Sequence, residues 1–349
     1  MREAEGRGRA GRGAAAREID SAIIRKIVTK PSFTLSSLHF SFSMSQIKIA
    51  FLGIGLMGAP QSRRILAAGF SLTAWNRTRA KAEALVPQGA SVAGTAAAAV
   101  AGADIVITML EHGSAVAEVL FNQGVAAALK QGALVVDMSS IKPAEARDHA
   151  ARIEALGCRH LDAPVSGGTL GAEAGTLAIM IGGNEADCAY AEPVFRAMGK
   201  PLRVGPHGAG QLAKLANQMI VGITIGAVSE ALQLAAAGGA DPALVREAIR
   251  GGFAGSKILE VHGERMLTRD FTARATATVQ LKDMNNALDA AAGSDYQLPI
   301  TTLLRDLYAS LCEHGGAGVD HSGLFLEIER INQGAGRAAI DYPVNHGST

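Results

Sequence analysis

Aromatic residues and cysteines are scarce in this chain of 349 residues. Only 4% of the residues are aromatic, whereas 48% are hydrophobic, so the core must be built from closely packed Ala, Val, Leu and Ile. The three cysteines, Cys158, Cys188 and Cys312, are odd in number, widely spaced and in no C-x-x-C arrangement. This pattern argues against a disulfide framework and against a structural zinc site. We therefore expect a reducing, cytoplasmic compartment.

An excess of charge of one sign is also lacking. The formal net charge is +1, which gives no electrostatic reason to expect nucleic acid or an anionic membrane as a partner. The chain has no H-E-x-x-H, G-x-S-x-G or Walker motif, and its nine histidines form no ligand cluster; metal-dependent and serine-hydrolase chemistry are therefore disfavoured. The most apolar segment, Met219 to Val228, is about half of the ~20 residues that span a bilayer. We expect it to be a buried core helix.

The first 43 residues differ in composition from the rest. Arginines there are set among Gly and Ala, and a Ser-rich stretch follows at 32–43. A transit peptide is Arg- and Ser-rich, but it avoids acidic residues, and this stretch has four of them: Glu3, Glu5, Glu18 and Asp20. Met44 stands directly before the first expected strand. We expect Met44 to be the natural start, and the upstream residues to be disordered or an over-extended gene prediction.

The length and the order of apolar segments predict two domains. Short apolar strands alternate with helical stretches, which is typical of a parallel sheet in a doubly wound fold. The expected strands are Ile47–Phe51, Leu72–Trp75, Ile105–Met109, Leu134–Asp137, Arg159–Asp162, Ala178–Ile181 and Leu202–Val204. After the glycines at 205–210 a long helix begins at about Gln211, and no clear strand follows. We therefore predict a Rossmann-type α/β domain at 44–207, joined by this interdomain helix to an all-helical domain at 208–335, and a tail at 336–349.

A glycine motif follows the first expected strand and opens a helical stretch. In a dinucleotide site the first glycine makes the tight turn, the second lets the backbone approach the pyrophosphate, and the third lets the helix pack on the strand. The phosphates then lie at the helix N-terminus. The motif consists of Gly53, Ile54, Gly55, Leu56, Met57 and Gly58.

The residues after the second expected strand indicate which dinucleotide binds. An NAD site would place Asp or Glu there against the ribose hydroxyls, and this chain has Asn76, Arg77 and Thr78 instead. A guanidinium can face a 2′-phosphate as a fixed fork of donors. NADP(H) is therefore favoured over NAD(H), although Arg77 could also be a solvated turn residue.

Several segments carry residues suited to acid–base chemistry. Lys214 and Asn217 lie three apart, hence on one helix face near the domain junction, and apolar neighbours would lower the pKa of the lysine. Ser166, Gly167 and Gly168 follow a strand and could hold a carboxylate through backbone N–H groups. Both have a simpler interpretation: Lys214 could be a surface lysine, and Ser166 to Gly168 could be an ordinary turn. Ser140 could contact nicotinamide or its ribose, and Lys282 could be a surface ion pair or a clamp on the cofactor.

Four separated motifs in this order resemble the β-hydroxyacid dehydrogenase family, over residues 47–332. They are Phe51 to Gly58, Asp162 to Gly168 with Gly175-Thr176-Leu177, Gly210 to Gln218, and Lys282-Asp283. Within the family the chain is most similar to the tartronate semialdehyde reductase branch, through Lys214 to Gln218, Ser229 to Leu232, Ala248 to Ser256 and Asp320-His321-Ser322.

The resemblance implies a role for each residue. Lys214 would be the general acid for reduction and the general base for oxidation, with the carboxylate loop at Ser166, Gly167 and Gly168 and a substrate contact at Asn217. Cofactor contacts would include Ser140, Lys282 and the backbone at Met109 and Leu110. The family often has Met-Leu-Pro where this chain has Met109-Leu110-Glu111, which places a carboxylate near the expected cofactor.

The resemblance implies NADPH-dependent, reversible reduction of a three-carbon carboxylic semialdehyde, tartronate semialdehyde, to glycerate. Alternatives within the family are 3-hydroxyisobutyrate dehydrogenase and a glyoxylate or succinic semialdehyde reductase. Lys214 argues against an imine reductase, which usually has Asp or Tyr there. A non-enzymatic dinucleotide-binding scaffold is the alternative from another class. The family is commonly dimeric or tetrameric, so a homodimer or homotetramer is expected.

Overall fold

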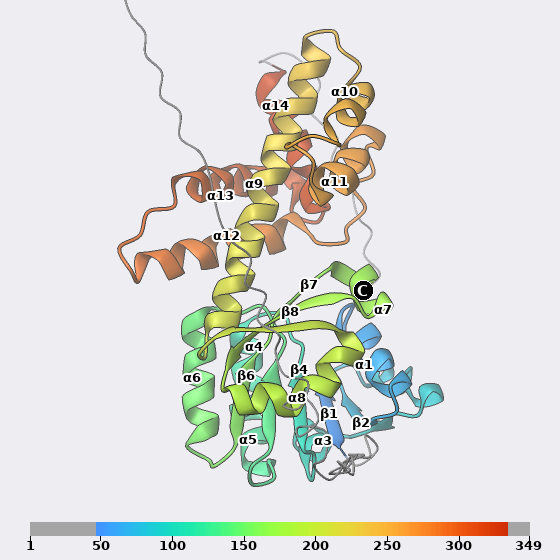
Figure 1. Ribbon diagram of the computed structural model, residues 1–349, viewed down its shortest axis with the longest axis vertical. Helices are drawn as coiled ribbons and strands as arrows, with labels where there is room; N and C mark the ends of the chain where they lie inside the picture. The colour runs from blue at the N-terminus through green and yellow to red at the C-terminus, as the bar shows by residue number, and fades with distance from the viewer. Residues whose placement is uncertain (1–46, 334–349) are drawn as a thin grey trace, which may run out of the picture. The chain divides into compact units, whose positions relative to one another are not determined.

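The computed structural model describes residues 47–333 (Figure 1). The expectations about residues 1–43 and about the tail at 336–349 concern segments outside this range. Nine strands form one sheet in the described part of the chain. They are β1 Lys48–Leu52, β2 Ser71–Trp75, β3 Ser91–Val92, β4 Ile105–Thr108, β5 Leu134–Asp137, β6 Arg159–Asp162, β7 Val165–Ser166, β8 Leu177–Gly183 and β9 Gly199–Gly205.

The strand order is β3-β2-β1-β4-β5-β6-β8-β7, with β9 paired to β8. Strands β1 to β6 pair in parallel, but β8 runs antiparallel to both β6 and β7. The expectation of a wholly parallel sheet is therefore wrong at this edge. The segment from Val165 to Leu177 turns back through only the short helix α7 (Gly168–Ala174), and a connection of that length favours an antiparallel return. Two short strands, β3 and β7, were not expected from the sequence.

Helices lie on both faces of the sheet, as the alternation of side chains along its strands requires. Ile49 and Phe51 of β1 belong to one buried apolar cluster, while Ala50 and Leu52 belong to another on the opposite face. Successive strand residues point to opposite faces, so a strand that is apolar throughout needs cover on both. The covering helices are α1 Gly58–Ala67, α2 Arg79–Glu83, α3 Ala96–Val100, α4 Gly113–Ala117, α5 Val125–Ala128, α6 Pro143–Glu154 and α8 Glu185–Met198.

All further regular elements after β9 in the described range are helical. They are α9 Ala209–Ala237, α10 Pro242–Ile249, α11 Lys257–Thr268, α12 Ala277–Ala292, α13 Pro299–Leu311, α14 Leu324–Asn332, the π-helical turn η5 Cys312–Gly316 and the 3-10 turn η6 His321–Gly323. Helices α10 and α13 each begin with a proline, Pro242 and Pro299, and the Asp241 side chain caps α10 by accepting from two backbone N–H groups. These helices enclose a third apolar cluster that includes Ile225, Leu304 and Tyr308.

The long helix α9 connects the sheet to the helical part (Figure 1). Its N-terminus is fixed at the sheet edge, because Asp162 at the end of β6 accepts from the N–H groups of Gly208 (2.7 Å) and Gln211 (2.9 Å). The side chain of Gln211 also bonds to Ser139 O and Ile141 N, beyond the end of β5. Residues one turn further along α9 are thereby held at the carboxyl edge of the sheet, where open α/β sheets bind ligands.

Among residues 47–333, α9 is the one helix whose length and composition would suffice to cross a membrane. It contacts β8 on the sheet and α11, α12 and α14 in the helical part, as a helix within a folded domain does. The expectation that residues 219–228 are buried is correct for one side of α9 only. Ile225 is fully buried, whereas Ile220 is 66% exposed.

Candidate active site

The glycine loop between β1 and α1 has the geometry of a dinucleotide cradle. A Cβ atom at Gly53, whose φ is +106°, would lie 2.3 Å from Met109 O, and one at Gly58 would lie 1.9 Å from Gly53 O. These two glycines are therefore required by the close approach of protein backbone. A Cβ at Gly55 would meet nothing within 4 Å. The space beside Gly55 is open, as the approach of a pyrophosphate requires.

The rest of this loop is consistent with an anion site. Helix α1 has no acidic residue in its first turn and no side chain capping its N-terminus, so its dipole and free N–H groups are available to a phosphate. Ile54 is buried, whereas Leu56 is 80% exposed and Met57 is half-buried. The residues of the loop therefore fit the phosphates of a bound NAD(P)(H).

Two of the three residues after β2 differ in what they contact: Asn76 bonds to the glycine loop, whereas the side chain of Arg77 is free to bind a ligand. Asn76 accepts from Ile54 N (2.9 Å) and donates to Thr78 O (3.0 Å), so its amide ties the glycine loop to the end of β2. Arg77 is exposed and has no partner within residues 47–333. Sequence reasoning gave Asn76 a direct ligand contact, and the structure gives it a supporting role as well.

The loops after β4 and β5 are joined beside the glycine loop. Leu110 N donates to Ser139 Oγ (2.9 Å), and Asp137 accepts from Thr108 Oγ1 (2.8 Å) and Ser139 N (3.0 Å). Burial raises the pKa of Asp137 to about 6, although hydrogen bonds from Ser139 and Thr108 act in the opposite direction. Ser140 Oγ is buried and has no protein partner in the described part of the chain. It remains available to a ligand.

Lys282 reaches from α12 to these loops. Its Nζ donates to Ser140 O (3.3 Å) and Glu111 O (3.4 Å) and lies 3.5 Å from Asp283 Oδ1. The Glu111 side chain is exposed, so the carboxylate that departs from the family pattern is solvated. Lys282 therefore links the helical part of the chain to two loops at the sheet edge.

Lys214 lies just past the anchored start of α9. Burial lowers the pKa of its ammonium, Asp283 raises it, and Lys282 lowers it further. The desolvation has the expected direction; of the apolar residues beside Lys214 on α9, Leu215 is buried and Leu212 is half-exposed. An ammonium whose charged form is disfavoured gives up its proton more readily, which is the property that a general acid needs near neutral pH.

Asn217 and Ser166 meet beside Lys214. Ser166 Oγ, at the end of β7, lies 3.4 Å from Asn217 Oδ1, a long hydrogen bond between residues 51 apart in sequence. Gly167 and Gly168 follow with φ of +137° and +62°, and a Cβ at Gly168 would meet nothing within 4 Å. The candidate carboxylate loop is thus exposed backbone that directly follows Ser166, the residue that bonds to Asn217.

Gln218 connects these residues, and sequence reasoning missed it. Its Oε1 accepts from Lys214 Nζ (3.0 Å) and Asn217 Nδ2 (2.9 Å), while its Nε2 donates to Asp283 Oδ2 (2.6 Å). Lys214 and Asn217 are therefore joined through Gln218 and have no direct bond to each other. The spacing of four residues from Lys214 on one helix was the available signal.

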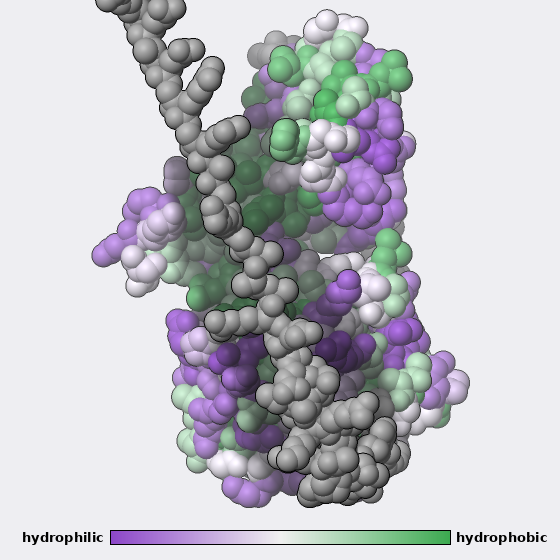
Figure 2. Space-filling view, viewed as in Figure 1, coloured by the Kyte–Doolittle hydropathy of each residue, from purple (hydrophilic) through white to green (hydrophobic). Residues whose placement is uncertain are grey.

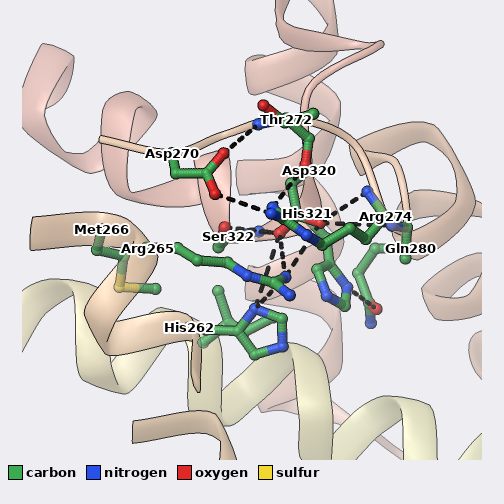
Figure 3. A network of polar contacts seen from close by, with 12 residues as sticks. His262, Arg265, Met266, Asp270, Thr272, Arg274, Gln280, Asp320, His321 and Ser322 are labelled. Atoms are coloured by element: carbon green, nitrogen blue, oxygen red, sulfur yellow. Dashed lines mark hydrogen bonds and ion pairs between the residues drawn. The ribbon is translucent and has the colours of Figure 1, made fainter. Parts of the chain in front are cut away.

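Figure 3 shows a polar cluster around Asp320. Gln280 joins it to Gln218, because its side chain bonds both to His321 and to the backbone carbonyl of Gln218. His262, Asp320 and His321 place possible metal ligands within 4.8 Å of one another. Asp320 already accepts from Arg265 Nη1 (3.4 Å), from Ser322 Oγ (2.6 Å) and from the backbone N–H of Arg274 (3.1 Å). The guanidinium of Arg265 already donates to the carboxylate of Asp320 and would compete with a metal ion for it. We therefore interpret the cluster as structural, and call it the Asp320 hub.

Family models match both parts of the chain. The NAD-binding domain of 6-phosphogluconate dehydrogenase matches residues 48–212. The NAD-binding region of NADP-dependent 3-hydroxyisobutyrate dehydrogenase matches residues 208–327. The chain belongs to the β-hydroxyacid dehydrogenase family. It is an NAD(P)-dependent oxidoreductase of small hydroxy acids or semialdehydes.

Individual β-hydroxyacid dehydrogenases match over most of their length. The 2-hydroxy-3-oxopropionate reductase of Escherichia coli (strain K12) is 42% identical over 81% of this chain and 97% of its own. The NAD-dependent L-serine dehydrogenase of Pseudomonas aeruginosa is 37% identical over 79% of this chain and 95% of its own. A structure of Mycobacterium tuberculosis 3-hydroxyisobutyrate dehydrogenase with L-serine is 34% identical and has a TM-score of 0.75, over 81% of this chain and 99% of that one. The family predicted from the motifs is confirmed, and its members differ in substrate.

Proposed function

We propose that this β-hydroxyacid dehydrogenase reduces tartronate semialdehyde to glycerate with NADPH, reversibly, and that Lys214 is its general acid and base. The observation that carries the proposal is the half-buried Lys214, whose ammonium has a lowered pKa and bonds to Gln218 Oε1, beside Ser166 and Asn217. The 42% identity to a 2-hydroxy-3-oxopropionate reductase supports this substrate over others of the family.

In the proposed reaction the protein's residues position the substrate and transfer one proton. A bound NADPH would supply the hydride that goes to the aldehyde carbon. Lys214 gives a proton to the carbonyl oxygen, which leaves glycerate and a neutral amine. Ser166 and the backbone at Gly167 and Gly168 hold the carboxylate, and Asn217 binds the substrate hydroxyl. Most of the rate enhancement then comes from orientation and from charge placed where the alkoxide develops.

We propose the same residues for the cofactor that the sequence indicated. The loop from Gly53 to Gly58 would hold the pyrophosphate, and Arg77, with Asn76 and Thr78, would face the 2′-phosphate of NADP(H). Met109, Leu110, Ser140 and Lys282 would contact the nicotinamide half. The unpartnered Ser140 Oγ and the exposed Arg77 support this assignment.

Steady-state kinetics with a substrate panel test the specific function. Tartronate semialdehyde, glyoxylate, succinic semialdehyde and methylmalonate semialdehyde would each be reduced with NADPH and with NADH, and L-serine and 3-hydroxyisobutyrate would be offered for oxidation. We expect tartronate semialdehyde to lead by about tenfold or more in kcat/KM, which corresponds to about 1.4 kcal/mol in transition-state binding. A lead for 3-hydroxyisobutyrate would favour the second candidate, which the relative of known structure supports. Inactivity on all of them would favour a dinucleotide-binding scaffold.

We further propose two domains divided near residue 208, a cytoplasmic location, and a homodimer or homotetramer. Exposed apolar residues support association of the helical part. Leu234 is 75% exposed and Leu303 is 58% exposed, and Figure 2 shows hydrophobic residues gathered where α9 crosses α12 and α13. Apolar surface of this kind marks protein contacts. The molar mass in solution, measured by light scattering, tests this assembly, and a monomer at micromolar concentration would contradict it.

A further inference from the structure

We propose that Gln218 is the positioning residue of the acid–base group. Its side-chain amide, held from α12 by Asp283, fixes Lys214 and Asn217 relative to each other, and Gln280 of α12 holds its backbone carbonyl. His321 holds the far end of this chain of hydrogen bonds. The proposal rests on the proposed function only in taking Lys214 as the proton donor.

The orientation of the Gln218 amide is determined by its partners. Asp283 is 1% exposed, and its carboxylate can only accept, so the nitrogen of the amide must face it. The oxygen is then left for Lys214 and Asn217, and both of its lone pairs are used. A flipped amide would place N–H groups against the ammonium of Lys214. Gln218 therefore has one stable orientation.

A second amide fixes the helix backbone under Gln218. Gln280, on α12 and 1% exposed, donates from Nε2 to Gln218 O (3.0 Å). A backbone carbonyl only accepts, so Oε1 of Gln280 must be the atom that faces His321 Nδ1, 3.2 Å away. The hydrogen on the ring is therefore on Nδ1. His321 is neutral in this arrangement, and burial lowers its pKa to about 4.

The chain of hydrogen bonds ends at His321, which belongs to the polar cluster around Asp320 (Figure 3). His321 follows Asp320 directly, its ring meets that of His262 edge-on at 4.8 Å, and its carbonyl accepts from Tyr308 Oη (3.1 Å). Asp320 itself is fully buried and accepts from backbone N–H groups at Arg274 and Ala275, just before α12 begins. The hub thus fixes η6 and the start of α12 together, and with them Gln280 and Asp283.

The consequence for catalysis is geometric. An ammonium has three donors, and Gln218 takes one of them, so the other two are aimed by that bond. Charged or titratable groups that act on Lys214 are Asp283 and Lys282 from α12 and His321 from η6. A misplacement of about 1 Å of a reacting group can cost about 100-fold in rate. Gln218 prevents such a misplacement.

Two substitutions at Gln218 test the proposal in opposite directions. Gln218→Leu keeps the volume and removes the acceptor of the ammonium, so we expect kcat to fall by about 10- to 100-fold and the apparent pKa in kcat/KM to move down. Gln218→Glu keeps an acceptor for Lys214 but removes the N–H that Asp283 accepts. Two carboxylates then face the ammonium, so the apparent pKa should move up. A merely structural glutamine would give no such opposed shifts.

Gln233→Leu is the matched control. Gln233 lies on the same helix, about 22 Å from Gln218 at 1.5 Å per residue, and its Nε2 donates to Phe325 O (2.7 Å). We expect its pH profile to match that of the unmodified enzyme. Opposed pKa shifts at position 218 support the proposal; unmoved pKa values, or shifts in the same direction, overturn it. If Gln218→Leu does not fold, Gln218→Glu is compared with the unmodified enzyme alone.

Lys214→Ala separates this proposal from the proposed function. If Lys214→Ala retains turnover, the proton donor is wrong, whatever Gln218 does. If Lys214→Ala is inactive while both Gln218 variants match Gln233→Leu, the proposed function survives and the positioning role fails.

Discussion

The two ends of the proposed active site, one for the cofactor and one for acid–base chemistry, are built in different ways. The cofactor end uses backbone: Gly53 and Gly58 are packed against neighbouring carbonyls, and Gly55 faces open space. The acid–base end uses side chains from α9, α12 and η6, joined through Gln218, Gln280 and Asp283. A backbone site depends on a few contiguous residues, whereas a side-chain site depends on the packing of distant helices. The two ends should therefore respond differently to substitution.

The largest expected effect is at Lys214. Lys214→Ala removes the proton donor but no residue of the glycine loop, so we expect kcat to fall by about 10²- to 10⁴-fold while the dissociation constant for NADPH changes by less than about threefold. Stopped-flow turnover and fluorescence titration of NADPH measure the two quantities. Lys257→Ala, at an exposed lysine paired with Glu260, is the control and should change neither. Joint loss of turnover and binding would contradict the separation of the two ends.

Paired glycine substitutions sharpen the comparison at the other end. Gly55→Val fills open space, so we expect an unchanged melting temperature and about 100-fold weaker NADPH binding. Gly58→Ala forces a Cβ to within 1.9 Å of Gly53 O, so the backbone must move, at a cost of about 1–3 kcal/mol in the free energy of unfolding. Calorimetry measures the stability of the two variants, and titration with NADPH measures their affinity for the cofactor. Equal effects of the two changes on stability would show that Gly55 is also a packing glycine.

A smaller effect is expected at Arg77. Charge-assisted hydrogen bonds contribute about 1.5–3 kcal/mol, so Arg77→Ala should raise KM for NADPH about tenfold or more and leave KM for NADH nearly unchanged. Arg79→Ala, at an exposed arginine that pairs with Glu83, is the neighbouring control. Equal changes in the two KM values would mean that Arg77 does not recognise the 2′-phosphate.

The smallest effect concerns stability and not turnover. The pKa of Asp137 is about 6 in the folded protein and about 3.8 when solvated, so the native state binds more protons between these values. Stability therefore falls as pH rises from about 4 to about 6. Asp137→Asn should remove this contribution and raise the free energy of unfolding at pH 7 by about 1–3 kcal/mol relative to the unmodified protein. Urea titrations at pH 4 and pH 7 measure the free energy of unfolding of both proteins. If the difference between them is the same at both pH values, the raised pKa of Asp137 is contradicted.

Local patterns made the cofactor end predictable. The strand, the glycine spacing and the helix start lie within 20 residues of one another, and so do Asp241 and Pro242 at the start of α10. The acid–base end needed contacts between residues far apart: Gln218 and Asp283 are separated by 65 positions, and Gln280 and His321 by 41. Nothing in the periodicity of α9 or α12 gives the register between them. The sequence predicts Lys214 on the first turns of the interdomain helix, but it could not show that Gln218 accepts from its ammonium.

The antiparallel edge of the sheet was missed for a similar reason. Strand β7 has two residues, Val165 and Ser166, and pairs with β8 across a seven-residue helix. Two residues carry no alternation of their own, so their pairing is decided by tertiary contacts. This edge matters to function because it presents Ser166 to Asn217.

The most direct test of the account is the pH dependence of kcat/KM, measured in both directions of the reaction with the unmodified enzyme. In the proposed mechanism Lys214 is protonated for reduction and neutral for oxidation. Reduction should therefore fall, and oxidation rise, as pH increases, each through an apparent pKa below the usual lysine value of about 10.4. A reduction rate that stays flat beyond that value, or an oxidation rate that does not rise with pH, would show that Lys214 is not the group that moves the proton.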